Sequence, residues 1–399
     1  MPPLSALQFA PLTGRIAGRG ARAWSIHFEA LRRRAAGSPV ILLTVGDPDQ
    51  EAPAAVVEAT TAALQQGRTG YSPILGLPEL RAAIAARVER RSGVSCTAEN
   101  IAVVPGTQAG LYAALQCLAG PGDEVLAFEP IYATYEAVVG AASARLVTAP
   151  LRPETGFHPD LAALAAAVTP QTRVLWINTP HNPTGAVFTA AEIEAVAELA
   201  RRHDLWLLSD EVYEDLAFAR PHLSPRRLPG MAERTVVVSS LSKSHAMPGF
   251  RLGWIVGPEA LTPHLFNLML CMLYGGPPFI QLGALAALQH DLPEAAALAA
   301  EYQRRAALFA GILAEAPGCR AIPPEGGMFL LLDVRGTGLS AEDFARALLA
   351  EEGVAAVPCD GFGPSGHLRL ALTQPADILA EAGQRIVRQA RRLAARGAR

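Results

Sequence analysis

Lysine is almost absent from this sequence: Lys243 is the only one among the 34 lysine and arginine residues. A composition rich in alanine and arginine suggests a GC-rich genome, in which arginine replaces lysine on a solvated surface at little cost. The lysine that remains is a candidate for a position where arginine cannot serve, because arginine stays protonated whereas lysine can lose its proton and form an imine. Survival by chance explains the count equally well, so the surroundings of Lys243 must decide.

The sequence also lacks the features of several protein classes. Its five cysteines are scattered, odd in number and without a CxxC pair, which argues against a disulfide scaffold and favours the reduced cytoplasm. The N-terminal 18 residues have no unbroken apolar core, and the most apolar stretch, 261–288, is interrupted too often to span a membrane. With a net charge of −3 and no basic block, we expect neither nucleic acid nor a membrane as a partner.

Short apolar runs alternate with longer segments of helical period from about residue 41. Uniformly apolar strands are typical of a sheet covered on both faces, so we expect a mostly parallel α/β sheet followed by a smaller α+β unit. The expected strands are 41–45, 101–104, 124–128, 145–148, 174–177, 205–209, 235–239, 252–256, 329–333, 354–357 and 367–371. The expected helices are 53–66, 78–92, 108–119, 160–168, 189–203, 294–316, one from 340 and one from 375.

Ligands of open parallel sheets bind beyond the carboxyl ends of the strands, and the loops there carry polar residues. Gly106 permits a tight turn into a helix whose first amides, at Thr107 and Gln108, suit a phosphate. Prolines and a glycine around Asn182 favour one rigid orientation of its side chain. Asp210 follows the next strand, where a carboxylate could cap a helix, bind a metal or pair with a protonated ring nitrogen. No metal is expected, because none of the nine histidines has a ligand spacing.

The only lysine lies on the last of these loops, in the stretch SLSKSH. Serine hydroxyls stand on both sides of Lys243, and Arg251 follows eight residues later. A ligand that carries both a carbonyl group and a phosphate would use every one of these groups. Each loop taken alone is equally compatible with a structural turn, and only their combination points to a cofactor.

These four loops, in this order, resemble the class I and II aminotransferases, which depend on pyridoxal 5'-phosphate and have fold type I. The resemblance runs from about Gly46 to Arg369 and includes the motifs GDPD, PGDEV, PIY, NPTG, DEVY, SLSK and LRL. It implies a large cofactor-binding domain over 47–290, in which a mostly parallel seven-stranded sheet lies between helices. A discontinuous small α+β domain would comprise 1–46 and 291–399. A cytoplasmic homodimer is also implied.

The resemblance assigns the cofactor to particular residues. Lys243 matches the lysine that forms a Schiff base with the cofactor and moves the substrate proton, while Asp210 matches the carboxylate that keeps the pyridine nitrogen protonated. Tyr132 matches the aromatic ring that stacks on the pyridine, and these three are the expected catalytic residues. The other expected cofactor contacts are Asn182 and Tyr213 at the phenolic oxygen, and Thr107, Gln108, Ser240, Ser242 and Arg251 at the phosphate, with Tyr71 contributed by the neighbouring subunit.

The substrate is expected to bind through its α-carboxylate. Arg369 matches the arginine that forms a bidentate pair with this group, with Asn182 and the backbone of Gly46 closing over the substrate. The implied reaction moves an amino group from an L-amino acid to a 2-oxoacid. A β-lyase or an oxidase on the same fold remains an alternative, because the cofactor motifs do not separate these outcomes.

Several stretches outside the cofactor loops resemble the bacterial arginine:pyruvate aminotransferases of arginine catabolism. They are 15–27, 240–254, 270–281 and 362–372. The likeness favours L-arginine as donor and pyruvate as acceptor, with an aspartate, alanine or aromatic donor as the alternative. A guanidinium donor needs a carboxylate facing it, and Glu29, Asp49 and Glu129 are the candidates.

Overall fold

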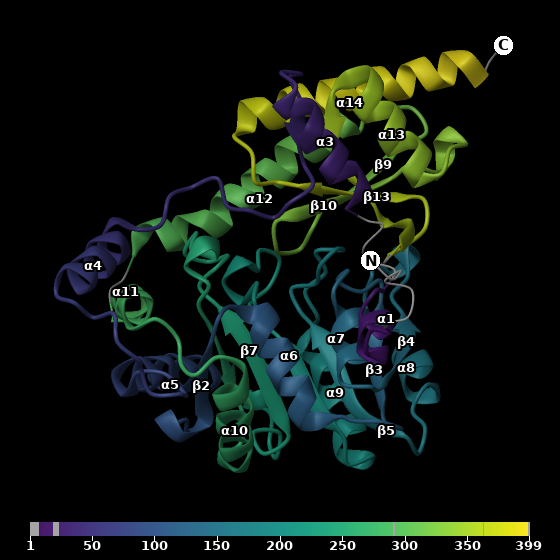
Figure 1. Ribbon diagram of the computed structural model, residues 1–399. Coiled ribbons are helices and arrows are strands. Elements are labelled where there is room, and N and C mark those ends of the chain that lie inside the picture. The colour runs from purple at the N-terminus through teal and green to yellow at the C-terminus, as the bar shows by residue number, and fades with distance from the viewer. Residues whose placement is uncertain (1–7, 19–23, 290–291, 362, 398–399) are drawn as a thin grey trace, which may run out of the picture.

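The computed structural model describes residues 8–18, 24–289, 292–361 and 363–397, and a seven-stranded sheet forms the centre of its larger part (Figure 1). The strand order is β2-β8-β7-β6-β5-β3-β4. Neighbouring strands are parallel except at β8, which is antiparallel to both β2 and β7. The expected mostly parallel α/β sheet is confirmed. Its strands are β2 (Ile101–Val104), β3 (Glu124–Glu129), β4 (Arg145–Pro150), β5 (Thr172–Asn178), β6 (Trp206–Asp210), β7 (Thr235–Ser240) and β8 (Gly253–Val256).

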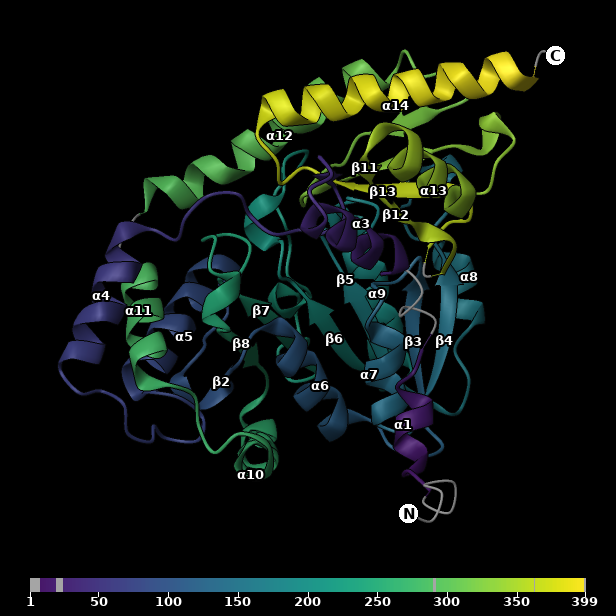
Figure 2. The same ribbon diagram turned by 45° about the horizontal axis from the view of Figure 1, so that its top comes forward.

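Helices cover both faces of this sheet. Since successive side chains of a strand point to opposite sides, neighbouring residues of one strand pack against different helices. On β3, Val125 packs in a core with α6 (Thr107–Leu118), α7 (Tyr135–Ala141) and α10 (Thr262–Met272). Its neighbour Leu126 packs on the other face with α8 (Leu161–Ala166) and α9 (Ala190–Arg202). The rest of that face is covered by α5 (Pro78–Ser92) and α11 (Pro278–Gln289), beside which α4 (Ala54–Gln65) lies at one end of the molecule (Figure 2).

A smaller α+β unit lies over the carboxyl ends of the central strands, at the top of Figure 1. Its antiparallel sheet has the order β12-β13-β10-β9, and a short parallel pair joins β1 to β11. Two long helices, α12 and α14, cross this unit and pack with α3 and α13 around one core. The bounds are α3 (Ser25–Ala35), β1 (Ile41–Leu42), α12 (Pro293–Leu313), β9 (Arg320–Ile322), β10 (Phe329–Asp333), α13 (Ala341–Glu352), β11 (Val354–Ala355), β12 (Val357–Pro358), β13 (His367–Ala371) and α14 (Ala376–Gly397).

The proposed division into domains at 46/47 and 290/291 remains a prediction. Residues 1–7, 19–23 and 290–291, on which parts of it fall, lie outside the described residues, as does Phe362 of the stretch 362–372. Helix α1 (Pro11–Arg15) packs against α7, where the Arg15 Nε donates to the Gly140 oxygen at 3.1 Å. In the parts of the chain that the structure covers, no helix has the length and apolar character needed to cross a membrane.

The strand expected over 41–45 is wrong in length, since β1 ends at Leu42. Beyond it, the chain leaves β11 and turns towards β13: the Leu43 oxygen accepts from the Ala371 amide at 2.9 Å. The next two backbone oxygens accept from side chains: that of Thr44 from Arg369, and that of Val45 from the Thr373 hydroxyl. A continuous ladder is therefore replaced by contacts that bring residues 44–46 to the edge of the site.

Candidate active site

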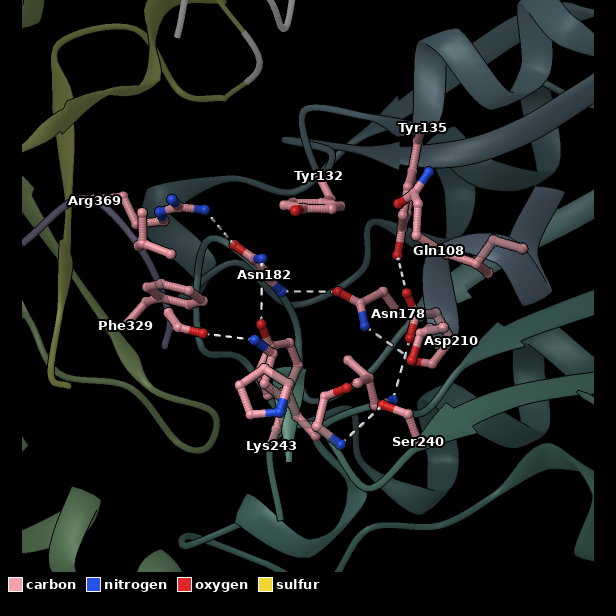
Figure 3. Close-up of a pocket in the computed structure, with 18 of the residues that line it drawn as sticks. Gln108, Tyr132, Tyr135, Asn178, Asn182, Asp210, Ser240, Lys243, Phe329 and Arg369 are labelled. Carbon is pink, nitrogen blue, oxygen red and sulfur yellow. Dashed lines mark hydrogen bonds between the residues drawn. The ribbon is translucent and has the colours of Figure 1, made fainter. Parts of the chain in front are cut away.

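A cavity of about 190 Å³ lies where the central strands end beneath the small sheet (Figure 3). Every residue expected to bind the cofactor or the substrate backbone lines it, with the exception of Tyr71, whereas the three candidate carboxylates for a guanidinium donor do not. The expected residues in its wall are Gly46, Thr107, Gln108, Tyr132, Asn182, Asp210, Tyr213, Ser240, Ser242, Lys243, Arg251 and Arg369. These residues come from five loops, the start of α6 (Thr107–Leu118) and two sheets, and positions as far apart in the sequence as Gly46 and Arg369 meet in one space.

Lys243 lies in the loop after β7, and its Nζ donates to the Gly46 oxygen at 2.6 Å. Burial lowers the pKa of the Lys243 amine to about 8, and the charges of Arg251 and Arg369 act in the same direction, against the opposing charge of Asp47. Glycine is favoured at position 46 because Phe329 packs closely against its backbone. A Cβ there would lie 2.5 Å from the Phe329 Cζ.

Asp210 ends β6 and is almost completely buried. Its Oδ2 accepts from the Tyr135 hydroxyl at 2.7 Å, and its Oδ1 accepts from the Val212 amide at 3.2 Å. Burial raises the pKa of the Asp210 carboxyl to about 6, whereas the Tyr135 hydrogen bond lowers it. A buried carboxylate of this kind is suited to a cationic N–H partner, as a protonated pyridine ring would supply.

Tyr135 was not predicted as a site residue. Its ring stacks on Trp176 with centroids 4.0 Å apart, and Tyr132 meets it edge-on at 5.8 Å. One signal for it exists in the sequence, since Tyr135 follows Tyr132 by three residues, close to one helical turn at the start of α7. Spacing alone could not have identified Asp210 as its partner, because that carboxylate comes from another strand.

Two asparagines, one at the end of β5 and one in the loop that follows it, connect the two ends of the cavity (Figure 3). Asn178 donates through Nδ2 to the backbone oxygen of Asp210 at 3.0 Å and accepts through Oδ1 from the backbone amide of Asn182 at 2.8 Å. Asn182 in turn donates to the Tyr213 hydroxyl at 3.5 Å and accepts from Arg369 Nη1 at 3.2 Å. Asn178 was also not predicted, although it lies only four residues before Asn182.

Hydroxyls, a helix N-terminus and a guanidinium group surround the end of the cavity next to α6. The Thr107 Oγ1 is buried and has no hydrogen-bond partner in the described chain, while Arg251 donates to the Pro248 and Pro105 oxygens at 2.7 and 3.2 Å. Gly106 precedes the helix with a φ of +85°, and a Cβ there would collide with the Arg251 guanidinium. An anion with several oxygen atoms fits this end, since it would supply the acceptor that the Thr107 hydroxyl lacks.

Arg369 closes the opposite end from β13 and is almost completely buried. Its Nη2 donates to the Thr44 oxygen at 2.8 Å, and its guanidinium carbon lies 4.3 Å from the centre of the Phe329 ring. Burial lowers the pKa of the Arg369 guanidinium, so a carboxylate that enters the cavity would stabilise its charge. Phe329 and Trp24 line the cavity as well, and neither was predicted.

Tyr71 lies outside the cavity. It is 88% exposed and makes an edge-on contact with Tyr274, whose ring centroid is 5.2 Å away. The assignment of Tyr71 to a neighbouring subunit stays a prediction. An aromatic ring left in solvent on one chain is compatible with it.

The three carboxylates proposed to face a guanidinium donor have other partners, and none is in the cavity wall as the structure describes it. Glu29 accepts from Arg33 Nε at 2.9 Å on the surface of α3. Asp49 forms a bidentate pair with Arg305, both N–O distances being 2.9 Å. Glu129 accepts from the Thr148 hydroxyl at 3.1 Å.

The sheet order and the cavity are those of pyridoxal-phosphate-dependent enzymes of fold type I. Comparison with known proteins identifies the family within this class. The model of the family "Aminotransferase class I and II" matches residues 38–386, so the chain belongs to that family and uses pyridoxal phosphate to transfer amino groups.

Two relatives and two solved structures illustrate the similarity. The chain is 51% identical to arginine–pyruvate transaminase AruH of Pseudomonas aeruginosa, over 95% of this chain and 97% of that protein. It is 36% identical to an aspartate/prephenate aminotransferase of Thermus thermophilus, over 91% and 94%. The aspartate aminotransferase of Rhizobium meliloti superposes with a TM-score of 0.92 at 29% identity, over 97% and 99%. A Thermus thermophilus aspartate aminotransferase mutant gives 0.90 at 33% identity, over 96% and 100%.

Proposed function

We propose that this chain transfers the amino group of L-arginine to pyruvate. The observation that carries the proposal is the 51% identity to an arginine–pyruvate transaminase over almost the whole of both chains. Five aspartate or aspartate/prephenate aminotransferases of bacteria and archaea are only 31–36% identical to the chain. Substrate choice in such pockets depends on a few contacts worth about 1–3 kcal/mol each, so overall identity is the better guide here.

The cofactor-binding roles follow from the cavity. Pyridoxal phosphate supplies an aldehyde that reacts with amines and a ring that accepts electrons from the substrate. Lys243 would hold it through Nζ, Asp210 would face the ring nitrogen, and Tyr132 would cover the ring. Asn182 and Tyr213 would bond its phenolic oxygen. The phosphate would lie among Thr107, Gln108, Ser240, Ser242 and Arg251.

The remaining groups would handle the substrate and its proton. Arg369 would bond the α-carboxylate with both arms of its guanidinium, and Asn182 would fix its orientation through the hydrogen bond to Nη1. A pKa of about 8 allows the Lys243 amine, when free, to accept and return the substrate's α-proton near neutral pH. The Gly46 oxygen, 2.6 Å from Nζ, would keep this amine oriented.

We also propose a cytoplasmic homodimer, in which Tyr71 reaches the phosphate of the neighbouring subunit. All five cysteines are free thiols, as a reducing compartment favours. Exposed apolar side chains, among them Tyr71, Tyr274, Phe266 and Leu270, offer a surface that a second subunit could cover.

The cofactor assignment is tested by reduction with borohydride. The purified protein should absorb visible light, and reduction should fix the cofactor to one peptide that contains Lys243. Since no second lysine exists, Lys243→Ala should abolish transamination. A reduced protein with unmodified Lys243 would overturn the assignment.

The substrate assignment is tested with a panel of amino donors, offered with pyruvate and with 2-oxoglutarate, while the 2-oxoacid product is measured. Arginine with pyruvate should give the highest kcat/KM. A clear preference for aspartate, alanine or an aromatic donor would contradict the proposal, and release of ammonia or peroxide in place of a new amino acid would favour the lyase or oxidase alternative.

A further inference from the structure

Arg305 is a buried arginine outside the cavity that connects two substrate-facing segments. It lies on α12 and is only 6% exposed. Its Nη1 and Nη2 donate to the two Asp49 oxygens at 2.9 Å each, and Nη1 also donates to the Leu372 oxygen at 3.1 Å. Its Nε donates to Glu301, one turn earlier on the helix, at 2.6 Å. All three nitrogens are therefore in use, on three separate segments.

The first of these segments follows Gly46, the residue whose oxygen receives the Lys243 amine. In the described chain, residues 46–52 make no hydrogen bond from one backbone group to another, and α4 begins only at Ala54. The bidentate contact of Asp49 is thus the strongest polar attachment of this segment, three residues from Gly46. Charged pairs of this fork geometry are stronger and more directional than neutral hydrogen bonds.

The second segment is the end of β13, the strand that carries Arg369. Leu372 follows its last residue, Ala371. The chain before Gly46 already lies along this strand, through the bond from Ala371 to Leu43 and that from Arg369 to Thr44. Arg305 joins the same two segments again on the far side of Gly46. The Gly46 oxygen, which faces the Lys243 amine, and the Arg369 guanidinium, which would face the substrate carboxylate, are thereby held at a fixed separation.

We propose that Arg305 is a positioning residue for the substrate, and that its clamp on Asp49 holds Gly46 and Arg369 in the relative placement that the α-carboxylate and the amino group of the substrate require. The inference rests on the proposed function, since Arg369 is assigned there to the substrate carboxylate and the Gly46 oxygen to the Lys243 amine that exchanges a proton with the substrate. Asp49, one of the candidates to face a guanidinium donor, lies outside the cavity wall and already has an arginine partner within the chain.

The chain provides a matched control in the preceding residue. Arg304 pairs with the same Glu301, but its side chain is 71% exposed and faces solvent. Arg305→Met and Arg304→Met each remove one guanidinium from the same turn of α12, and only the first releases the 46–49 segment. Asp49→Asn removes the charge from the other side of the clamp with little change in shape.

The test compares these variants as holoenzymes. Because a displacement of about 1 Å at a substrate-positioning contact can cost on the order of 100-fold, Arg305→Met and Asp49→Asn should lower kcat/KM for amino acids by roughly 10- to 100-fold, chiefly through KM. Arg304→Met should match wild type. The double variant Asp49→Asn/Arg305→Met should lose little more than either single variant, as expected for two groups of one contact. Retention of the cofactor should stay as in wild type for all of them.

A binding measurement gives a readout independent of turnover. The probe is 5-guanidinopentanoate, which has the carboxylate of arginine but no amino group, titrated into the holoenzyme by calorimetry. Its affinity should fall in Arg305→Met and remain unchanged in Arg304→Met. Agmatine, the amine without a carboxylate, should react slowly with wild type and equally slowly with Arg305→Met. Should Arg305→Met fail to fold, Arg305→Lys, which keeps the charge but loses the fork, and Asp49→Asn serve in its place.

The possible failures are distinguishable. If wild type transaminates amino acids and both Arg305→Met and Asp49→Asn keep the wild-type KM and the wild-type affinity for 5-guanidinopentanoate, Arg305 is purely structural and the inference is overturned. It is overturned equally if these variants lose cofactor and substrate binding together, because the defect is then not confined to the substrate. A wild-type enzyme inactive with arginine would instead contradict the proposed function.

Discussion

Replacement of Arg369 by lysine is expected to impair the enzyme severely while leaving the cofactor in place. The guanidinium is buried, donates to the Thr44 and Asn182 oxygens and lies on the Phe329 ring. An ammonium group keeps the charge, but it has no planar fork and cannot satisfy these acceptors and both oxygens of a carboxylate at once. Loss of one partner of a buried charged pair costs about 2–5 kcal/mol, which corresponds to a loss of roughly 30- to several-thousand-fold in kcat/KM.

The assay is single-turnover kinetics of both half-reactions. Amino acid and 2-oxoacid present the same carboxylate to the same arginine, so Arg369→Lys should lower kcat/KM in both. Simple amines, which have no α-carboxylate, should react slowly with wild type, and their kcat/KM should fall little further in the variant. Visible absorbance should show an undiminished amount of bound cofactor. Near-normal kcat/KM for amino acids in Arg369→Lys would refute the reasoning, because the carboxylate would then be bound elsewhere.

Three further substitutions test other parts of the site. Tyr71→Phe should weaken cofactor retention, measured as absorbance after dialysis, without unfolding the protein. A fully active monomer at nanomolar concentration would contradict the role of Tyr71 at a subunit interface. Tyr135→Phe removes a hydrogen bond that lowers the pKa of Asp210, so this pKa should rise further and the acidic limb of the kcat/KM profile should move to higher pH; an unchanged profile would show that the hydroxyl does not affect the carboxylate. Gly46→Ala places a methyl group 2.5 Å from Phe329, and such overpacking should cost about 1–3 kcal/mol, visible as a lower Tm and a higher KM.

The arrangement of the central loops could be predicted because parallel strands end on the same edge of a sheet. Strands β5, β6 and β7 are neighbours, with Asn178 opposite Asp210 and Asp210 opposite Val238. Once the apolar runs are recognised as adjacent strands, the residues that follow them must meet. Asn182, Asp210 and Lys243 accordingly all line one cavity, as Figure 3 shows.

The partners of these residues could not be predicted, because they depend on packing across the molecule. Nothing in the sequence around Asp49 indicates a partner for its carboxylate. Only the fold brings Arg305, 256 residues later, to its side. Tyr135 is likewise one of several aromatic residues until the start of α7 places its hydroxyl on Asp210. Sequence patterns specify which element a residue occupies, whereas hydrogen-bond partners depend on how elements approach one another.

The scarcity of lysine acquires its meaning from the same geometry. Arginine occupies the other cation positions in and beside the site, as Arg251, Arg305 and Arg369 show with their contacts to carbonyl and carboxylate oxygens. Position 243 differs in two respects: its amine is buried near two guanidinium groups, and its pKa is lowered to about 8. A guanidinium there would remain charged and could neither bond covalently to an aldehyde nor accept a proton near neutral pH. A composition that replaces lysine wherever charge alone is needed thus retains it at the one position where the charge must be lost.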